Sequence, residues 1–167
     1  MEKETIALTD ITVDLRLNIR ESLDDETIKR YTENFEQLPP AVVFESDDTY
    51  LLADGFHRYE AANKLGRDEI EVEVRHGTRQ DAEEYAALAN LKHGKPLTRK
   101  ERRKAVERML MLHSERANAW IAEDTGVSKN TVAKYREELE SKCQIDRCST
   151  FRTKDGREFP REIKQPS

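Results

Sequence analysis

The chain has 167 residues, of which 38% are charged and only 7% are aromatic, so it has room for one domain or two small ones with much solvated surface. No run of residues approaches the roughly 18 consecutive apolar positions that a membrane helix needs. The first residues show no charged segment followed by an apolar run. We therefore expect no signal peptide, no membrane partner and a cytoplasmic location.

Charge is distributed unevenly along the chain. Residues 1–91 carry 10 Lys and Arg against 22 Asp and Glu, whereas residues 92–140 carry 12 against 8 and residues 141–167 carry 7 against 4. The overall charge of −5 therefore hides an acidic front part and a basic back part. Only the back part suits a partner that carries phosphates.

The front part mixes strand and helix signals. Apolar residues alternate over residues 6–15, which predicts one strand or two short ones. Residues 24–38 predict a helix with an acidic first turn, which the following Pro39-Pro40 ends. Further strands are predicted at 41–45, 49–53 and 70–74, a turn at 46–48, and further helices at 57–65 and 78–91. Residues 1–93 therefore predict a small mixed α/β domain.

The back part is predicted to be helical. Gly94-Lys95-Pro96 marks its boundary with the front part, and Thr98 to Glu101 fit a capping box that opens a helix reaching about His113. Five basic residues occupy six positions at the start of this helix: Arg99, Lys100, Arg102, Arg103 and Lys104. Each one alone is most simply a solvated side chain, but the cluster favours a phosphate contact.

Residues 118–139, NAWIAEDTGVSKNTVAKYREEL, fit a helix-turn-helix. Ala122 is the small residue that two crossing helices need, Gly126 suits the turn, and Ser128 is a typical N-cap of the second helix. The predicted apolar seam consists of Ile121, Val127, Val132 and Tyr135. The alternative is an ordinary helical hairpin with a glycine turn, which gives no reason for these offsets or for a basic second helix.

The outward face of the second helix is predicted to carry Lys129, Asn130, Thr131, Lys134 and Arg136. The segment resembles the helix-turn-helix of bacterial regulators, whose second helix enters the major groove of double-stranded DNA. By this resemblance the amide of Asn130 and the hydroxyl of Thr131 suit base edges. The cations at positions 129, 134 and 136 suit phosphates, and the phosphate contacts of the preceding helix would come from Arg99, Arg102 and Arg103.

Residues 51–62 combine a strand, a glycine turn at Gly55 and the start of a helix. This geometry points backbone N–H groups at an anion, and His57 and Arg58 would add charged donors. The plainer alternative is a tight connection between strand and helix, with both side chains merely exposed.

The sequence DGFHRYEAANKLG at residues 54–66 resembles the glycine-arginine motif of the ParB/sulfiredoxin superfamily, whose members bind nucleotide phosphates at this turn. Residues 18–20, 40–43 and 89–93 resemble further elements of ParB-like domains. The resemblance implies an α+β protein with a ParB/sulfiredoxin-like domain over residues 1–93 and an all-α DNA-binding domain over residues 94–140. It also implies a site for CTP or ATP with magnesium, with these binding residues: Gly55, His57, Arg58, Asn90 and Arg20.

Three positions depart from the family pattern. Phe56 stands where sulfiredoxin has its cysteine, which excludes that thiol chemistry. His57 replaces the first of two arginines found in ParB proteins that hydrolyse CTP, and Ala89 replaces a glutamate that helps to hold magnesium. These departures favour a protein that is not an enzyme. Free-serine kinases of the same superfamily also carry a glycine-histidine-arginine turn, so an enzyme remains an alternative, with Asp54, His57 and Glu60 as candidate acid/base groups.

The tail over residues 141–167 is basic. The sequence FRTKDGREF at 151–159 predicts a β-hairpin around Asp155-Gly156, which would touch DNA or a partner subunit, and a disordered tail is the alternative. The 27 residues after Glu140 are too few for the dimerisation domain of a chromosomal ParB. Cys143 and Cys148 lack the companion ligands of a zinc site, so we interpret them as reduced thiols and expect no metal site.

The sequence therefore predicts a ParB-like DNA-binding protein that acts in transcription regulation, plasmid partition, or phage or plasmid maintenance. The front domain would set oligomerisation, with a homodimer as one option. One alternative is a nucleotide-dependent enzyme (a nucleotidase, kinase or nuclease) that the back part targets to DNA. A protein-interaction adaptor is the second alternative, which the overall acidic charge supports.

Overall fold

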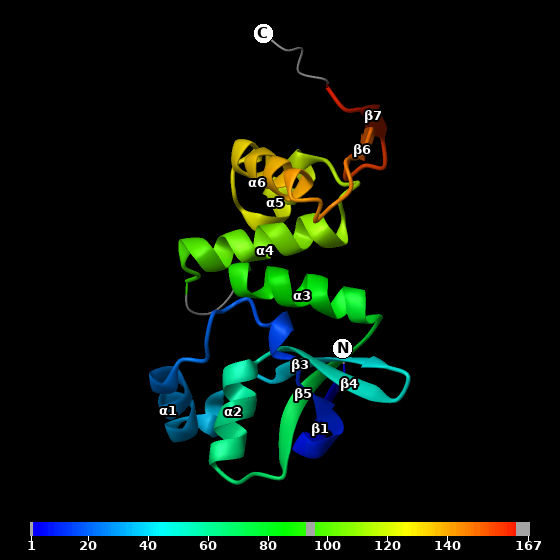
Figure 1. Ribbon diagram of the computed structural model, residues 1–167. Helices are drawn as coiled ribbons and strands as arrows, with labels where there is room; N and C mark the ends of the chain where they lie inside the picture. The colour runs from blue at the N-terminus through cyan, green and yellow to red at the C-terminus, as the bar shows by residue number, and fades with distance from the viewer. Residues whose placement is uncertain (1, 93–95, 163–167) are drawn as a thin grey trace. The chain divides into compact units, whose positions relative to one another are not determined.

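The computed structural model describes residues 2–92 and 96–162 of the chain. The chain divides into two compact units, Met1–Asn90 and Leu91–Ser167 (Figure 1). In the predicted boundary Gly94-Lys95-Pro96, the first two residues lie outside the described residues. No helix within the described residues is both long enough and apolar enough to cross a bilayer.

A five-stranded sheet forms the centre of the first unit, with the strand order β1-β5-β3-β4-β2. The strands are β1 (Glu2–Ala7), β2 (Ile11–Thr12), β3 (Ala41–Ser46), β4 (Thr49–Asp54) and β5 (Glu69–His76). β3 pairs in parallel with β5 and antiparallel with β4, while the edge strands β1 and β2 pair with β5 and β4. The three strands predicted over residues 41–74 are confirmed. The segment at 6–15 forms two strands separated by a 3-10 helix, Leu8–Asp10.

Three helices follow the strands of this unit: α1 (Asp25–Glu33), α2 (Phe56–Lys64) and α3 (Arg79–Lys92). α1 and α2 lie side by side, and α2 packs on β3 and β5 (Figure 1). α1 ends earlier than the predicted helix over residues 24–38. Asn34 leaves the helical conformation and its side-chain amide donates to the carbonyl of Arg30 (3.1 Å), so only a 3-10 turn, Phe35–Gln37, continues the chain.

The core of the first unit is aliphatic. Val43, Leu52 and Val72 come from three neighbouring strands and are completely buried, and Ala62 of α2 belongs to the same cluster. In β5 buried residues alternate with more exposed ones, as expected for a strand with one face on the core. The small residues on α2 allow the helix to pack closely on the sheet, so the glycine turn that precedes α2 is held in a fixed position.

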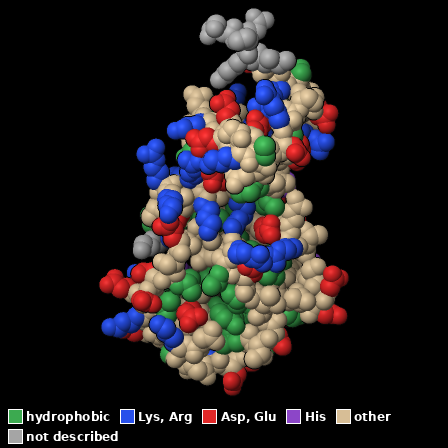
Figure 2. Space-filling model, in the orientation of Figure 1, with side chains coloured by type: hydrophobic (Ala, Val, Ile, Leu, Met, Phe, Trp, Pro, Cys, Tyr) green, Lys and Arg blue, Asp and Glu red, His purple; other side chains and the backbone are tan. Residues whose placement is uncertain are grey.

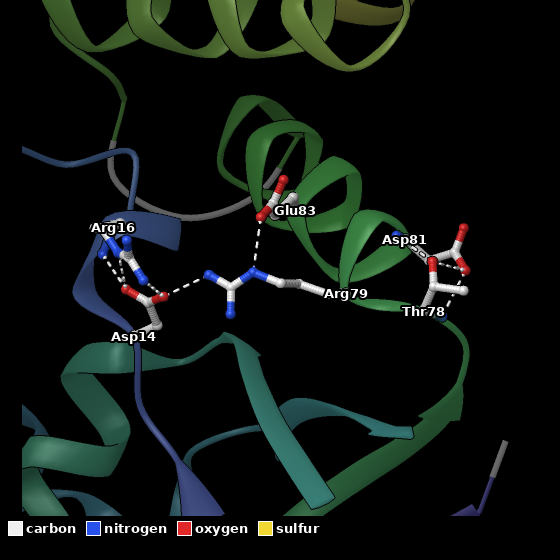
Figure 3. A network of polar contacts seen from close by, with 6 residues as sticks. All are labelled: Asp14, Arg16, Thr78, Arg79, Asp81 and Glu83. Carbon is white, nitrogen blue, oxygen red and sulfur yellow. Dashed lines mark hydrogen bonds and ion pairs between the residues drawn. The ribbon is translucent and has the colours of Figure 1, made fainter. Parts of the chain in front are cut away.

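A network of charged side chains joins the start of α3 to the segment after β2 (Figure 3). Asp14 accepts hydrogen bonds from Arg16 (Nη2 to Oδ2, 2.8 Å) and from Arg79, which also donates from Nε to Glu83 (3.0 Å). The hydrogen bonds from Arg16 and then Arg79 hold the pKa of Asp14 well below its usual range. Asp14 is 14% exposed and Arg16 is 85% exposed, so the network has its carboxylate inside and one arginine in solvent.

The second unit contains three helices and a hairpin: α4 (Arg99–Leu112), α5 (Asn118–Thr125), α6 (Lys129–Ser141), β6 (Thr150–Arg152) and β7 (Glu158–Pro160). The predicted capping box at the start of α4 is confirmed, with the Thr98 N–H donating to Glu101 (2.8 Å) and the Glu101 N–H donating to the Thr98 hydroxyl (3.1 Å). Val106, Ile121 and Val132 form the centre of a core that all three helices share. The hairpin predicted at 151–159 is also confirmed, because β6 and β7 pair antiparallel.

Candidate nucleic-acid interface

A glycine turn joins α5 to α6. Gly126 has φ 72°, and its N–H donates to the carbonyl of Ala122 (2.9 Å), which ends α5. Two residues later, the hydroxyl of Ser128 accepts a hydrogen bond from the Thr131 N–H (3.1 Å) and starts α6. Ile121 is completely buried in the seam between the two helices. The predicted turn and N-cap therefore have the positions that the sequence indicated. Of the predicted seam, Ile121, Val132 and Tyr135 are buried and Val127 is half-buried.

Three of the predicted DNA-contacting side chains lie on the exposed surface of α6: Lys129, Asn130 and Lys134. Within residues 2–92 and 96–162, no hydrogen bond or ion pair involves these three side chains. Asn130 and Lys134 are one helical turn apart and share a face. Thr131 is half-buried, with its hydroxyl 2.8 Å from the Ser128 hydroxyl. The N-terminal half of α6 therefore presents one amide and two ammonium groups to solvent.

Arg136, which was predicted to contact phosphate, is instead buried, with 1% of its surface exposed. Its Nε donates to Asn118 Oδ1 (2.7 Å), and its Nη atoms donate to the carbonyls of Ser114 (2.6 Å) and Arg116 (2.5 Å). The guanidinium also lies over the Phe151 ring, 4.6 Å from its centroid. Burial lowers the pKa of Arg136, yet an arginine stays charged in proteins, so this is a buried cation held by the fold.

Arg103 also differs from its prediction. Its guanidinium donates to Glu107 (2.8 Å) on α4 and to Glu138 on α6, and it lies 4.6 Å from the centroid of the Tyr135 ring. These contacts tie α4 to α6 and engage two of the three guanidinium nitrogens of a side chain that is 36% exposed. Arg103 is therefore a bridge inside the second unit.

Arg99 and Arg102, the other two predicted phosphate contacts, lie on the exposed surface of α4. No ion pair is recorded for either side chain among the residues that the structure describes. Lys and Arg side chains gather over α4 on the face shown in Figure 2. The α4 surface therefore keeps basic groups that suit a polyanion.

A second glycine turn, in the first unit, connects β4 to α2. Gly55 has φ 97°, and a Cβ at this position would lie 2.8 Å from the Ala41 Cβ and 3.1 Å from the Ala41 Cα. Both the left-handed conformation and the close approach of β3 therefore require glycine. The Tyr59 N–H donates to the Gly55 carbonyl (2.8 Å) and closes the first turn of α2.

Arg58, predicted to bind phosphate, is held by this turn. Its Nη1 donates to the carbonyls of Pro39 (2.9 Å) and Pro40 (2.6 Å), and its Nη2 donates to Asp54 Oδ2 (3.1 Å). The side chain is 14% exposed. Arg58 therefore fastens the start of α2 to the segment before β3, and Asp54, one of the candidate acid/base groups, is its ion-pair partner.

The other predicted nucleotide ligands also have partners within the first unit. His57 Nε2 accepts a hydrogen bond from the Asp24 N–H (3.0 Å), so this nitrogen carries no proton and cannot donate to a phosphate at the same time. The backbone N–H of Arg20 donates to Asn18 Oδ1 (3.2 Å), and the side-chain amide of Asn90 donates to the Ala86 carbonyl (3.3 Å) of its own helix. The third acid/base candidate, at position 60, is half-buried on α2.

The side chains at the Gly55 turn do not fit a magnesium nucleotide as they lie. The His57 Nε2 and Arg58 Nη1 atoms, which could bind a phosphate, instead make hydrogen bonds within the domain. Ala89 offers no carboxylate for a cation, and the described residues contain no group of three or more His, Cys, Asp or Glu that could hold a metal. The backbone of the turn remains, but these side chains serve the structure.

Some residues that shape the second unit were absent from the sequence-based site. Asn118 and Phe151 both contact the Arg136 guanidinium, and Arg161 pairs with Glu140. The signal for Phe151 was its position opposite Phe159 around the Asp-Gly turn, which predicts an aromatic pair across the hairpin. Nothing in the local sequence indicated the contact with Arg136.

These elements define a class of protein: a mixed α/β domain built on a five-stranded sheet, followed by a helical unit in which a glycine turn joins two helices. Residues 3–91, more than half of the chain, match the family described as the ParB N-terminal domain. The chain therefore belongs to the ParB N-terminal domain family.

Two curated relatives are bacterial regulators. The chain is 36% identical over 118 residues to the transcriptional regulator NovG of Streptomyces niveus. It is 33% identical over 113 residues to a possible regulatory protein of the streptomycin biosynthesis operon of Streptomyces griseus. The matches cover 71% and 68% of this chain but 36% and 32% of the relatives. The chain thus spans about a third of the length of the curated relatives it matches.

Among solved structures, the chain is similar to the C-terminally truncated chromosome-partitioning protein ParB of Caulobacter crescentus, in complex with the centromeric parS site. The TM-score is 0.57 at 21% identity, over 81% of this chain and 71% of that one. At this level of identity the likeness concerns the fold.

Proposed function

We propose that the chain binds double-stranded DNA, with the N-terminal half of α6 in the major groove. One observation carries the proposal. Lys129, Asn130 and Lys134 are exposed on α6 directly after the glycine turn, and no ion pair or hydrogen bond within the described residues involves their side chains. Two ammonium groups without carboxylate partners suit phosphates, and an amide suits the edge of adenine.

The second support is electrostatic. Arg99 and Arg102 on α4 add two exposed cations to the same unit. Phosphate contacts set the position of a protein on the duplex, and base contacts give the specificity. In this proposal Asn130 is the main base contact, and each good bidentate contact of this kind discriminates against a wrong base by about 1–3 kcal/mol.

The role that the relatives favour is transcription regulation. Both curated relatives are named as regulators, and the ParB structure with the similar fold holds a DNA site. Partition of a plasmid, or phage or plasmid maintenance, would use the same contacts to DNA, so the geometry of α6 does not separate these roles. We favour the regulator because the two regulators match the sequence better than the partition protein does.

The contacts at the Gly55 turn determine whether the proposal includes a nucleotide. His57 and Arg58 would have to release Asp24 and the Pro39 and Pro40 carbonyls before they could bind phosphate. We therefore propose DNA binding that does not depend on a nucleotide held by these two side chains. This choice also sets aside an enzyme that would use them.

Selection of bound fragments from random duplex DNA tests the proposal. The full chain is incubated at low salt in three arms, without nucleotide, with CTP and magnesium, and with ATP and magnesium. We expect the same short motif to be enriched in all arms, and a palindromic motif would indicate a homodimer. Enrichment only with a nucleotide would contradict the nucleotide-independent binding. No enrichment and no mobility shift at low salt would contradict DNA binding and favour an adaptor.

The matched control for this selection changes the same number of lysines elsewhere. Lys29 and Lys64 are exposed on α1 and α2 of the first unit. A variant with Lys29→Ala and Lys64→Ala should select the same motif as the parent, while a variant with Lys129→Ala and Lys134→Ala should enrich it poorly. Equal enrichment by the two variants would remove α6 from the interface.

A further inference from the structure

The C-terminal hairpin is joined to the helices of the second unit through the backbone. The Arg152 N–H donates to the Glu115 carbonyl (2.7 Å), and the Ala117 N–H donates to the Arg152 carbonyl (2.8 Å). These two bonds form a parallel bridge between Arg116 and Arg152. Ala117 is the N-cap residue of α5, so β6 is attached at the point where α5 begins.

The hairpin also covers the guanidinium group that α6 buries. Phe151 is 8% exposed, and its ring lies 4.6 Å from Arg136 and 5.6 Å from Arg161. The Phe159 ring lies 6.1 Å from the Phe151 ring and is itself 39% exposed. Phe151 is thus the buried anchor of the hairpin, and Arg136 is the residue of α6 that it contacts.

A third connection reaches the last turns of α6. Arg161 donates to both carboxylate oxygens of Glu140, at 2.6 and 2.8 Å. The two side chains are 17% and 9% exposed, so solvent screens this pair only weakly. Together with Asn118, which accepts from Arg136, these contacts fix the C-terminal half of α6 against the start of α5.

The cations of the hairpin itself already have carboxylate partners. Arg152 pairs with Glu158 (3.1 Å). Lys154 pairs with Glu123 (2.9 Å), and Arg157 pairs with Asp155 (3.1 Å). In this respect the hairpin differs from the N-terminal half of α6, where the lysines have no such partner among the described residues. Residues 150–161 carry four basic and two acidic residues, and Arg152, Lys154 and Arg157 each lie beside a carboxylate.

We infer that the hairpin, residues 150–161, is a strut that fixes the angle between α5 and α6, with Phe151 and Arg136 as positioning residues, and that it makes no phosphate contact of its own. The inference rests on the proposed function, because the effect of the hairpin is measured as a change in DNA affinity. A recognition helix has to be held to within about 0.5 Å of its binding geometry by the residues that support it. The strut supplies this support for α6 from the side that Arg136 faces.

Equilibrium binding at several salt concentrations tests the strut in the full chain, with the duplex recovered by the selection as the probe. Phe151→Ala should bind about tenfold more weakly than the parent. The slope of log K against log salt should stay as in the parent, because that slope counts phosphate contacts and none is removed. The matched control, Lys154→Ala with Arg157→Ala, removes two hairpin charges and should leave both affinity and slope unchanged.

A milder variant keeps the test valid if Phe151→Ala does not fold. Glu140→Gln removes the negative charge and one of the two acceptor oxygens that Arg161 contacts but leaves the packing, and it should weaken binding about threefold with an unchanged slope. Circular dichroism at the binding temperature shows whether each variant is folded. Folded variants at positions 140 and 151 that bind as tightly as the parent would overturn the inference. A smaller slope in the Lys154 and Arg157 variant would overturn it too, because the hairpin would then contact phosphate. If the parent protein binds no duplex, the proposed function is contradicted, and the inferred role of the hairpin is overturned as well.

Discussion

The two glycine turns of the molecule use their neighbouring cations in opposite ways. After Gly55, Arg58 points back to the Pro39 and Pro40 carbonyls and is 14% exposed. After Gly126, Lys129 and Lys134 point away from the helices and are exposed. Gly55 is the left-handed N-cap of α2, and Gly126 is the left-handed residue that ends α5, two positions before the Ser128 N-cap of α6. Basic residues follow both glycines in the next helix. The sequence patterns are similar, but Arg58 makes its contacts within the domain, whereas Lys129 and Lys134 are exposed and available to a partner.

The difference comes from backbone carbonyls supplied by distant parts of the chain. Residues 39 and 40 end a loop whose carbonyls have no strand partner at that point, and Arg58 satisfies them. A guanidinium has five donors in a planar fork, so it suits this task, whereas an ammonium group on a flexible stem does not. The same holds in the second unit, where Arg136 is buried and Lys134 is exposed on the same helix. Arg58 and Arg136 therefore stabilise the fold, whereas Lys129 and Lys134 remain exposed to solvent.

Replacement of Arg136 should give the largest effect on stability. Arg136→Met removes the three hydrogen bonds to Asn118, Ser114 and Arg116 and leaves two half-buried carbonyls without this donor, so we expect a loss of about 3 kcal/mol in the free energy of unfolding. The matched control Lys134→Met should change it by less than about 0.5 kcal/mol. Urea denaturation followed by the fluorescence of Trp120, the single tryptophan and a residue of α5, measures both. Equal midpoints for the two variants would show that the two side chains do not differ as described.

Replacement of Arg58 should have a smaller effect in the first unit. Arg58→Met removes the bonds to Pro39, Pro40 and Asp54 from a side chain at the edge of the core, so we expect a loss of about 2 kcal/mol. Lys64→Met, at the exposed end of the same helix, should be nearly neutral. Urea denaturation followed by circular dichroism reports the change. If Arg58→Met lowered the free energy of unfolding no more than Lys64→Met, the turn would not depend on Arg58. That result would favour a role for Arg58 in binding phosphate.

The network around Asp14 should give the smallest effect, and the effect should depend on pH. Asp14→Asn removes the charge that Arg16 and Arg79 contact, at an expected loss of about 1 kcal/mol at neutral pH, because Arg16 is largely exposed. The pKa of Asp14 is lowered in the folded state, so its contribution is complete above the ordinary value of about 3.9 and is lost as the pH falls below it.

Thermal unfolding of the parent and Asp14→Asn at pH 7 and pH 3 measures this difference. We expect the gap between the two proteins to be smaller at pH 3. Asp68→Asn, at an exposed position of the same unit, is the control and should follow the parent at both values. A gap that widens on acidification would mean that the charge on Asp14 does not stabilise the folded state.

Local patterns predicted the elements and their ends. The Thr98 to Glu101 capping box, the Ser128 N-cap, the Gly126 turn and the hairpin all depend on residues a few positions apart, and all are present. A local hydrogen bond is decided by local sequence, so such features can be predicted from a single chain.

The environment of charged side chains could not be predicted in the same way. Arg136 follows Lys129 by seven residues and shares its face of α6, so periodicity places both outward. The hairpin, whose β6 begins at Thr150, then covers the C-terminal half of that face. His57 likewise accepts its hydrogen bond from Asp24, which is 33 positions earlier in the chain. Whether a basic residue is exposed therefore depends on long-range packing that helix periodicity does not contain.

The salt dependence of DNA binding by the parent and by Lys129→Ala with Lys134→Ala tests the central claim most directly. Each phosphate contact contributes about 0.9 to the slope of log K against log salt, so the double variant should bind more weakly with a slope smaller by about 2. The Lys29→Ala and Lys64→Ala variant, with the same change of charge in the first unit, should keep the parent slope. If the Lys129 and Lys134 variant bound with the affinity and slope of the parent, α6 would not be the surface that meets DNA.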